Sequence, residues 1–222
     1  MFDDPSFRRG LRDTILIFFA VAAFGVAYGV LALDVGLPPW LTLFSSVIIV
    51  SGAAQFAMVG LLAAGPVPVL VAATGLGLRH LPMSATLARL VGAQPLATRL
   101  RLAFVLVDET FGLTVRAANA GVENLVAYKT AADLMLYSGW FLGTGIGVWF
   151  GTAINPESAG VGVLFGLLFL GLAAPMVNGR RDWIVVGASV AATLIATLIL
   201  PPAWQVTVAA TTASLVGIAV GE

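Results

Sequence analysis

The chain contains no cysteine and a single histidine, His80. Without cysteine there can be no disulfide, thiol nucleophile, iron–sulfur cluster or thiolate metal site. One histidine cannot supply a zinc or haem site built from several imidazoles, and no HExxH, GxSxG or P-loop pattern occurs. We therefore expect no metal, no cofactor and no enzymatic activity.

Charge is also scarce. Charged residues make up 10% of the 222 residues, with a formal net charge of zero, whereas soluble domains carry about 25%. A neutral chain offers no electrostatic attraction to nucleic acid. With 59% hydrophobic residues and a mean hydropathy of +1.02, the composition is that of an integral membrane protein.

Long apolar runs dominate what remains. They predict an all-α polytopic membrane protein with six to eight hydrophobic segments, some of them discontinuous or re-entrant, in one transmembrane domain spanning residues 1–222. Turn formers such as Gly65–Pro66 separate the runs. The eight candidate segments are 14–33, 39–64, 66–88, 102–120, 134–154, 159–177, 183–200 and 203–220.

Basic residues set the expected orientation, because cytoplasmic loops are enriched in lysine and arginine. If all eight segments cross and residues 1–13 are cytoplasmic, six basic residues outside the segments lie inside and three lie outside. Making one segment within 39–88 and one within 134–177 re-entrant changes the split to eight and one, with only Lys129, in a loop, outside. Segment 66–88, which contains several prolines, favours such an irregular arrangement.

A few charges lie within segments that otherwise resemble membrane spans. Arg79 and His80 lie in segment 66–88, and Asp108 and Glu109 lie in segment 102–120. Such residues cost about 2.5–3.5 kcal/mol each on insertion scales, so they usually face a cavity, pair or carry substrate. We expect both carboxylates to face the protein interior, with Arg79 as a partner and His80 as a group that titrates near neutral pH. The alternative is an ion pair that only locks two helices together.

Two further patterns involve small residues. The stretch Ser51–Phe56 places Gln55 among small residues, which suits either a broken helix that exposes polar groups to a ligand or close helix packing. A glycine at every fourth position predicts a helix-packing face, within this chain or against another subunit. These glycines are Gly139, Gly143, Gly147 and Gly151.

Four motifs together resemble the AzlC family of branched-chain amino acid exporters. They are FGVAYG at 24–29, SGAAQF at 51–56, LRHLPM at 78–83 and VDETFGL at 107–113. Onto this chain the resemblance carries the motif positions Gln55, Arg79, His80, Asp108 and Glu109. One departure is Gly77, where family members commonly have asparagine.

The resemblance implies the large subunit of a two-component exporter in the bacterial cytoplasmic membrane, working with a small hydrophobic AzlD-type partner. A branched-chain amino acid needs an anion partner, a cation partner and an apolar pocket. We expect Ser51, Gly52, Gln55, Arg79, Asp108 and Glu109 to bind the substrate, with Phe56, Phe104 and Phe111 as pocket walls.

Because no nucleotide-binding motif is present, export against a gradient requires an ion. Proton coupling through His80, Asp108 or Glu109 is the simplest device. The competing functions are a passive channel or proton pathway, an intramembrane enzyme using His80 with Asp108 or Glu109, and a purely structural subunit.

Overall fold

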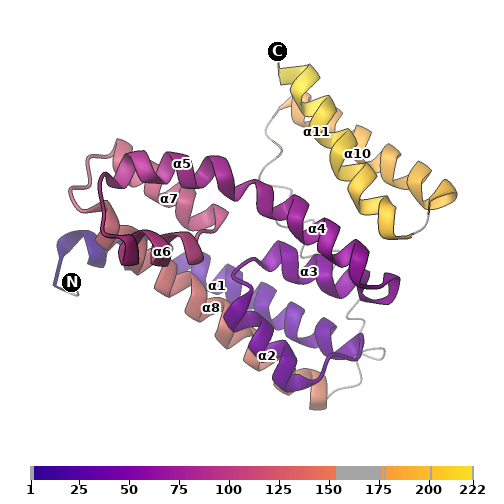
Figure 1. The fold of residues 1–222 in the computed structure, drawn as a ribbon, viewed down its shortest axis with the longest axis horizontal. Helices are drawn as coiled ribbons and strands as arrows, with labels where there is room; N and C mark the ends of the chain where they lie inside the picture. Colours follow the sequence, from indigo (N-terminus) through magenta and orange to yellow (C-terminus); the bar gives the residue numbers. More distant parts are fainter. Residues whose placement is uncertain (1–2, 154–176, 178, 201, 222) are drawn as a thin grey trace. The chain divides into compact units, whose positions relative to one another are not determined.

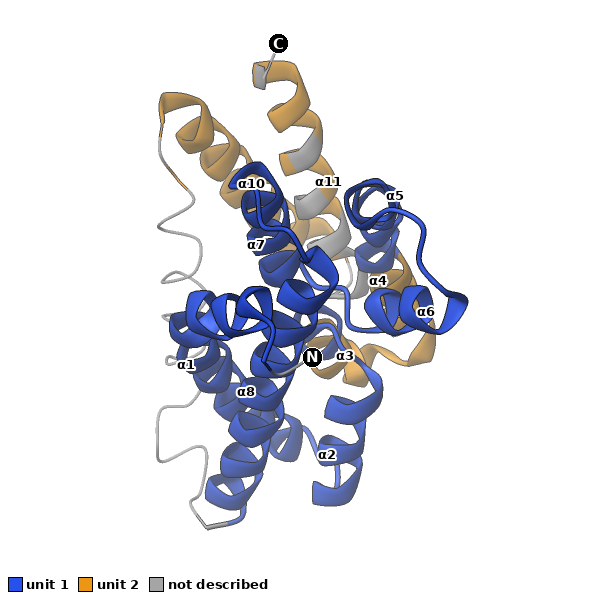
Figure 2. Cartoon of the chain, turned by 90° about the vertical axis from the view of Figure 1, so that its left-hand side faces the viewer, with its two compact units in different colours: residues 1–56, 75–161 blue, residues 57–74, 162–222 orange. Residues whose placement is uncertain are grey.

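The computed structural model describes residues 3–153, 177, 179–200 and 202–221 (Figure 1). Candidate segment 159–177 lies outside the described residues apart from its last position. The chain divides into two compact units, residues 1–56 with 75–161 and residues 57–74 with 162–222 (Figure 2). The described helices are α1 (Pro5–Asp34), α2 (Pro39–Ile48), α3 (Gly52–Leu61), α4 (Pro66–Leu78), α5 (His80–Val91), α6 (Leu96–Phe104), α7 (Asp108–Asn119), α8 (Leu125–Ala153), α10 (Arg180–Ile199) and α11 (Pro202–Gly221), with a short 3₁₀ turn at Leu62–Ala64.

The first unit is built on α1 and α8, which share the most extensive helix–helix contact among the described elements (Figure 1). The contact depends on glycine. A Cβ on Gly143 or Gly147 would clash with the backbone of Ala22 or Val26, and one on Gly25 would lie 2.5 Å from the carbonyl oxygen of Trp140. The glycine stripe is thus a packing surface within this chain, as in small-residue helix pairs of membranes.

The two helices run in the same direction. Gly139 faces Phe18, Gly143 faces Ala22 and Gly147 faces Val26, so positions advance together along both helices. Two parallel neighbours in a bilayer require an odd number of crossings between them.

If both helices cross the bilayer, their common direction favours one of the two predicted arrangements. With one re-entrant segment in 39–88, only two segments would cross between the first and fifth candidates, and α8 would run antiparallel to α1. Crossing by each of the three intervening candidate segments gives the observed direction, in keeping with the eight-segment alternative.

The N-termini of α1 and α8 are joined by their caps. Asp4 accepts a hydrogen bond from the backbone N–H of Ser6 at 2.8 Å, and Asn124 accepts one from that of Ala127 at 3.0 Å. The Asn124 amide also donates to Asp4 at 2.7 Å. The hydrogen bonds that Asp4 accepts, led by the one from the Ser6 backbone, lower the pKa of Asp4. Each cap therefore satisfies its own helix and holds the other in register.

Three of the predicted segments are discontinuous. Segment 39–64 breaks at residues 49–51 between α2 and α3, and segment 66–88 breaks at Arg79 between α4 and α5. Segment 102–120, expected as one stretch, is not a single helix, since α6 ends at Phe104 and α7 begins at Asp108. Each break coincides with one of the sequence motifs.

Two described helices are long and apolar enough to cross a membrane by length and composition, namely α1 and α10. The shorter apolar helices include α2, α3 and part of α11. In the second unit, α10 and α11 lie against each other. The number of membrane crossings therefore stays a prediction.

The α1–α8 contact predicts opposite effects for two similar substitutions. Gly143→Ala should lower the free energy of unfolding by about 1–3 kcal/mol, because its methyl group overpacks the backbone of α1. Gly145→Ala, which meets nothing within 4 Å, should be neutral or stabilise α8 by up to about 1 kcal/mol. Thermal unfolding of the two purified variants in detergent measures the difference, and equal shifts would contradict this packing.

Candidate functional site

Arg79 and Asp108, expected to pair, do so in the structure. Arg79 Nη1 lies 2.7 Å from Asp108 Oδ2. The side chains are 38% and 48% exposed, and Glu109 is also exposed, so the expectation that both carboxylates face the interior of the chain is wrong. Because both side chains are partly exposed, the pair remains accessible to a polar ligand.

Local sequence explains why both residues lie at helix breaks. Pro82 has no N–H to bond to the carbonyl of Leu78, and its ring crowds that carbonyl, so the helix breaks at Arg79. Asp108 and Glu109 occupy the first turn of α7, where the helix dipole favours negative charge. The breaks therefore place one cation and two anions at the ends of short helices in the same unit.

Arg79 retains hydrogen-bonding capacity beyond the ion pair. Its Nε is buried and has no hydrogen-bond partner among the described residues. A guanidinium presents five donors in a planar fork that matches a carboxylate. Glu109 forms no ion pair with the described residues either. The cluster can thus bind a second anion through the donors of Arg79 and a cation through the carboxylate of Glu109.

His80 contacts the backbone in the structure. Its Nδ1 lies 3.0 Å from the backbone oxygen of Gly77, and because a carbonyl only accepts, Nδ1 carries the proton of that bond. The imidazole thereby satisfies a carbonyl released by the break in the helix. A Cβ added to Gly77 would meet nothing within 4 Å, so the position has room for the family's asparagine.

Gln55 lies fully buried in the first turn of α3, away from this charged cluster. Its Nε2 donates to Ser45 Oγ at 3.1 Å and to Ser46 Oγ at 3.2 Å. Ser51 acts as the cap of α3, because its hydroxyl accepts from the backbone N–H of Ala54 at 3.4 Å. No hydrogen bond or ion pair within the described ranges joins Gln55 to Arg79 or Asp108.

The hydroxyl protons around Gln55 can be assigned from their neighbours. Ser45 donates its one proton to the carbonyl of Thr42 at 2.7 Å, so it accepts both from Gln55 and from the Tyr28 hydroxyl at 2.6 Å. The Tyr28 ring is completely buried. Ser45 is therefore a double acceptor and needs donors on both sides.

The same logic applies to Ser46. Thr144 donates to the carbonyl of Trp140 at 2.9 Å, so its hydroxyl oxygen accepts from Ser46 at 3.0 Å. Both serines then accept from Gln55, which fixes the orientation of its amide. Gln55 Oε1 is left buried with no hydrogen-bond partner in the described part of the chain. An unpaired buried acceptor costs about 1–3 kcal/mol, which a polar ligand or a water would recover.

Aromatic rings surround this network. Tyr28 stacks on Trp140 with centroids 5.8 Å apart, and Phe56 meets both rings edge-on at 5.9 and 6.0 Å. Gly52 permits this arrangement, since a Cβ there would lie 2.8 Å from Cη2 of Trp140. In the motif at 51–56, Ser51 caps α3 and Gly52 allows the Trp140 ring to approach the backbone. Gln55 supplies a buried amide, and Phe56 supplies an aromatic ring.

The other two phenylalanines expected to form pocket walls lie elsewhere. Phe104 is 57% exposed. Phe111 packs against a buried cluster formed by Met83, Leu87, Leu102 and Leu106. A cavity of about 230 Å³ between α5 and α6 is lined mainly by apolar side chains and by Arg99, and none of the predicted site residues borders it. None of the three rings borders this cavity.

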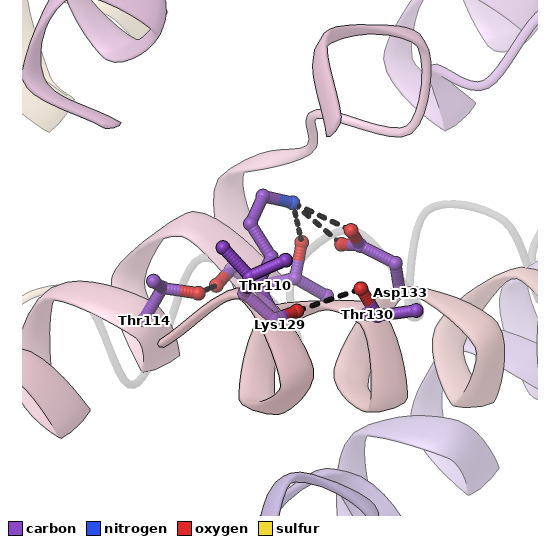
Figure 3. Close-up of polar contacts among 6 residues, drawn as sticks. Thr110, Thr114, Lys129, Thr130 and Asp133 are labelled. Atoms are coloured by element: carbon purple, nitrogen blue, oxygen red, sulfur yellow. Dashed lines mark hydrogen bonds and ion pairs between the residues drawn. The ribbon is translucent and has the colours of Figure 1, made fainter. Parts of the chain in front are cut away.

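A second ion pair was not anticipated. Lys129, expected in a loop, lies inside α8 and is completely buried, and its Nζ binds both carboxylate oxygens of Asp133 at 2.6 and 2.8 Å (Figure 3). Its third bond reaches the hydroxyl of Thr110 on α7 at 3.4 Å. The four-residue spacing of opposite charges in the sequence could have predicted this pair on a helix. The candidate segment 134–154 begins just after Asp133, so the pair was assigned to a loop.

Comparison with known proteins agrees with the motifs. A family model described as AzlC protein matches residues 16–154. An uncharacterized membrane protein of Archaeoglobus fulgidus is 32% identical over 79% of this chain and 78% of its own length. The inner membrane protein YgaZ of Escherichia coli is 26% identical over 84% of this chain and 80% of its own length. No solved structure matches the chain significantly.

The network around Gln55 predicts which of its members the fold requires. Gln55→Leu should change the free energy of unfolding by less than about 1 kcal/mol, because it removes an unpaired acceptor together with two donors. Ser46→Ala should cost about 1–2 kcal/mol, because Gln55 and Thr144 each lose a partner. Thermal unfolding in detergent compares them. A loss of more than about 2 kcal/mol in Gln55→Leu would show that the carbonyl has a structural partner.

Proposed function

Because the chain belongs to the AzlC family of membrane proteins, we propose that it is a secondary transporter that exports branched-chain amino acids across the cytoplasmic membrane. The accessible charge cluster of Arg79, Asp108 and Glu109 carries this proposal. It lies at breaks in two hydrophobic segments, and transporters commonly bind substrate at discontinuous helices.

The cluster fits the polar end of an amino acid. Nη1 of Arg79 holds Asp108, and the partly exposed guanidinium has further donors that can receive the substrate carboxylate. Asp108 is already neutralised by that pair, which leaves Glu109 as the partner for the substrate ammonium. The apolar side chain would then rest against the hydrophobic residues of the neighbouring helices.

Gln55 offers a second polar position within the same unit. Its unpaired carbonyl oxygen beside the rings of Tyr28 and Trp140 is suited to a donor such as an ammonium group or a water. In the proposed transport cycle, Ser51 and Gly52 act through this position, the first by capping α3 and the second by admitting the Trp140 ring.

A small hydrophobic AzlD-type subunit is the proposed partner. Charged side chains that are 38% and 48% exposed within hydrophobic segments need either a water-filled vestibule or a covering protein surface. A partner subunit packed beside the cluster would meet this requirement, and it would complete a binding site that this chain leaves open.

The substrate assignment predicts a charge-specific loss of transport. In proteoliposomes, Arg79→Ala and Glu109→Gln should each lower saturable leucine flux at least about tenfold, since hydrogen bonds to charged groups contribute ~1.5–3 kcal/mol. The matched control is Arg89→Ala, an exposed arginine in the last turn of α5 without an ion pair in the described part of the chain. Unchanged flux in Arg79→Ala would remove the assignment, and flux without saturation would indicate a channel.

The partner assignment predicts that the chain works as part of a complex. Affinity purification of the tagged chain from its native membrane should retain a small hydrophobic protein in fixed stoichiometry. Leucine flux should be at least about tenfold higher with that protein than with the chain alone. Full flux from the chain alone would refute the need for a second subunit.

A further inference from the structure

We propose that the buried pair Lys129–Asp133 is the proton-carrying site of this transporter, reached by water from a cavity beside α6 and connected to the substrate cluster through α7. The inference rests on the proposed export function and adds the group that would couple it to a proton gradient. It replaces the sequence-based candidates His80, Asp108 and Glu109 in that role.

The first argument is that the pair is a poor structural device. Lys129 and Asp133 are 0% and 4% exposed and lie on one continuous helix, so their mutual ion pair joins no two elements. Taking both charges out of water is expensive, and apolar side chains of similar volume are often at least as stabilising. Within the described ranges, the pair reaches another helix only at Thr110, to which the ammonium makes a long bond of 3.4 Å and which also interacts with the Asp133 carboxylate. The cost of burial is thus not explained by what the pair holds together.

The second argument is access for protons. Asp133 lines a mainly apolar cavity of about 90 Å³, whose other lining residues are Arg101, Leu102, Val105, Thr130, Leu134 and Tyr137. That volume has room for water, which needs about 10–15 Å³ of such space per molecule and polar groups to bind. A carboxylate that is shielded by protein yet borders such a cavity can exchange protons with water while remaining out of bulk solvent.

The third argument is the connection to the substrate cluster. Lys129 has three donor hydrogens, of which two face Asp133 and one faces Thr110 (Figure 3). Thr110 lies two residues after Asp108, in the first turn of α7. When Asp133 takes up a proton, Lys129 stays positively charged but loses its ion-pair partner. Its bond to Thr110 of α7 then remains.

The proton balance is simple. One proton enters from cavity water and forms an O–H bond on Asp133, and the pair gains one positive charge. The same proton leaves Asp133 to water on the other side when the site is exposed there, and the ion pair forms again. One proton moved inward per cycle can drive one zwitterion outward.

The charged groups on the neighbouring helices fit this assignment. From α6, Arg101 lines the same cavity as Asp133. From α1, Asp13 accepts from Tyr128, the residue before Lys129, and is held by Arg9 and Arg12. On α7, Asp108 is paired with Arg79, and no hydrogen bond or ion pair in the described part of the chain joins Glu109 or Arg116 to Lys129 or Asp133. On α5, His80 and Arg89 form no ion pair with Asp133, and α2 carries no charge.

The test separates exchange from proton-driven efflux. Proteoliposomes hold the purified chain with any subunit that copurifies, and they are loaded with labelled leucine. Exchange is measured with leucine on both sides at equal pH, and net efflux is measured with and without an acid exterior, with a pH dye reporting proton entry. The variant Asp133→Asn should keep exchange within about twofold of the unmodified chain, lose at least tenfold of the acid-stimulated efflux, and show no leucine-dependent proton entry.

The control is Asp34→Asn, an exposed carboxylate at the end of α1, which should leave both measurements unchanged. If Asp133→Asn does not yield folded protein, the neutral pair Lys129→Gln with Asp133→Asn keeps hydrogen-bonding groups at both positions and should behave in the same way.

The outcomes are distinct. Acid-stimulated efflux that persists in a folded variant overturns the proton site and leaves the exporter intact. Loss of exchange together with efflux, or failure of both variants to fold, assigns the pair to substrate binding or to the fold and also overturns it. Absence of leucine exchange in the unmodified chain refutes the proposed function, and the inference with it.

Discussion

The parallel contact between α1 and α8 is the constraint on which the first unit depends. Because glycine faces backbone on both helices, their axes approach more closely than side chains would allow. The helix α8 then serves as the platform for the polar interior. It carries Trp140 and Thr144 beneath Gln55, and Lys129 with Asp133 beneath α7. Both α2 and α7 pack on it as well.

The motifs coincide with interruptions of helices, and each interruption has its own cause. Ser51 caps a new helix, Pro82 breaks one at Arg79, and Asp108 begins another with negative charge at its positive end. Breaks of this kind are tolerated in a bilayer only where the freed backbone groups find partners. The bonds from His80 to Gly77 and from Tyr137 to Val47 show how this chain supplies them.

The two ion pairs differ in exposure and in the elements that carry them, which favours different functions for them. Arg79 and Asp108 come from separate helices, are half-exposed and retain an unpaired donor, as a ligand site requires. Lys129 and Asp133 share one helix, exclude solvent and use all three ammonium hydrogens. Because α7 touches both pairs, a change in one has a short mechanical path to the other.

Composition and motif order determined the class of protein and its family, because a chain this apolar can fold only in a membrane and because helix-breaking and charged residues are expensive there. The same cost made the pairing of Arg79 with a neighbouring carboxylate predictable. Tertiary structure alone decided the rest. A count of loop charges placed Lys129 outside the spans, whereas in the structure it is buried and contacts Thr110 of α7. The direction of α8 relative to α1 also came from the tertiary structure, since that direction depends on which glycine meets which backbone, a relation that no linear pattern specifies.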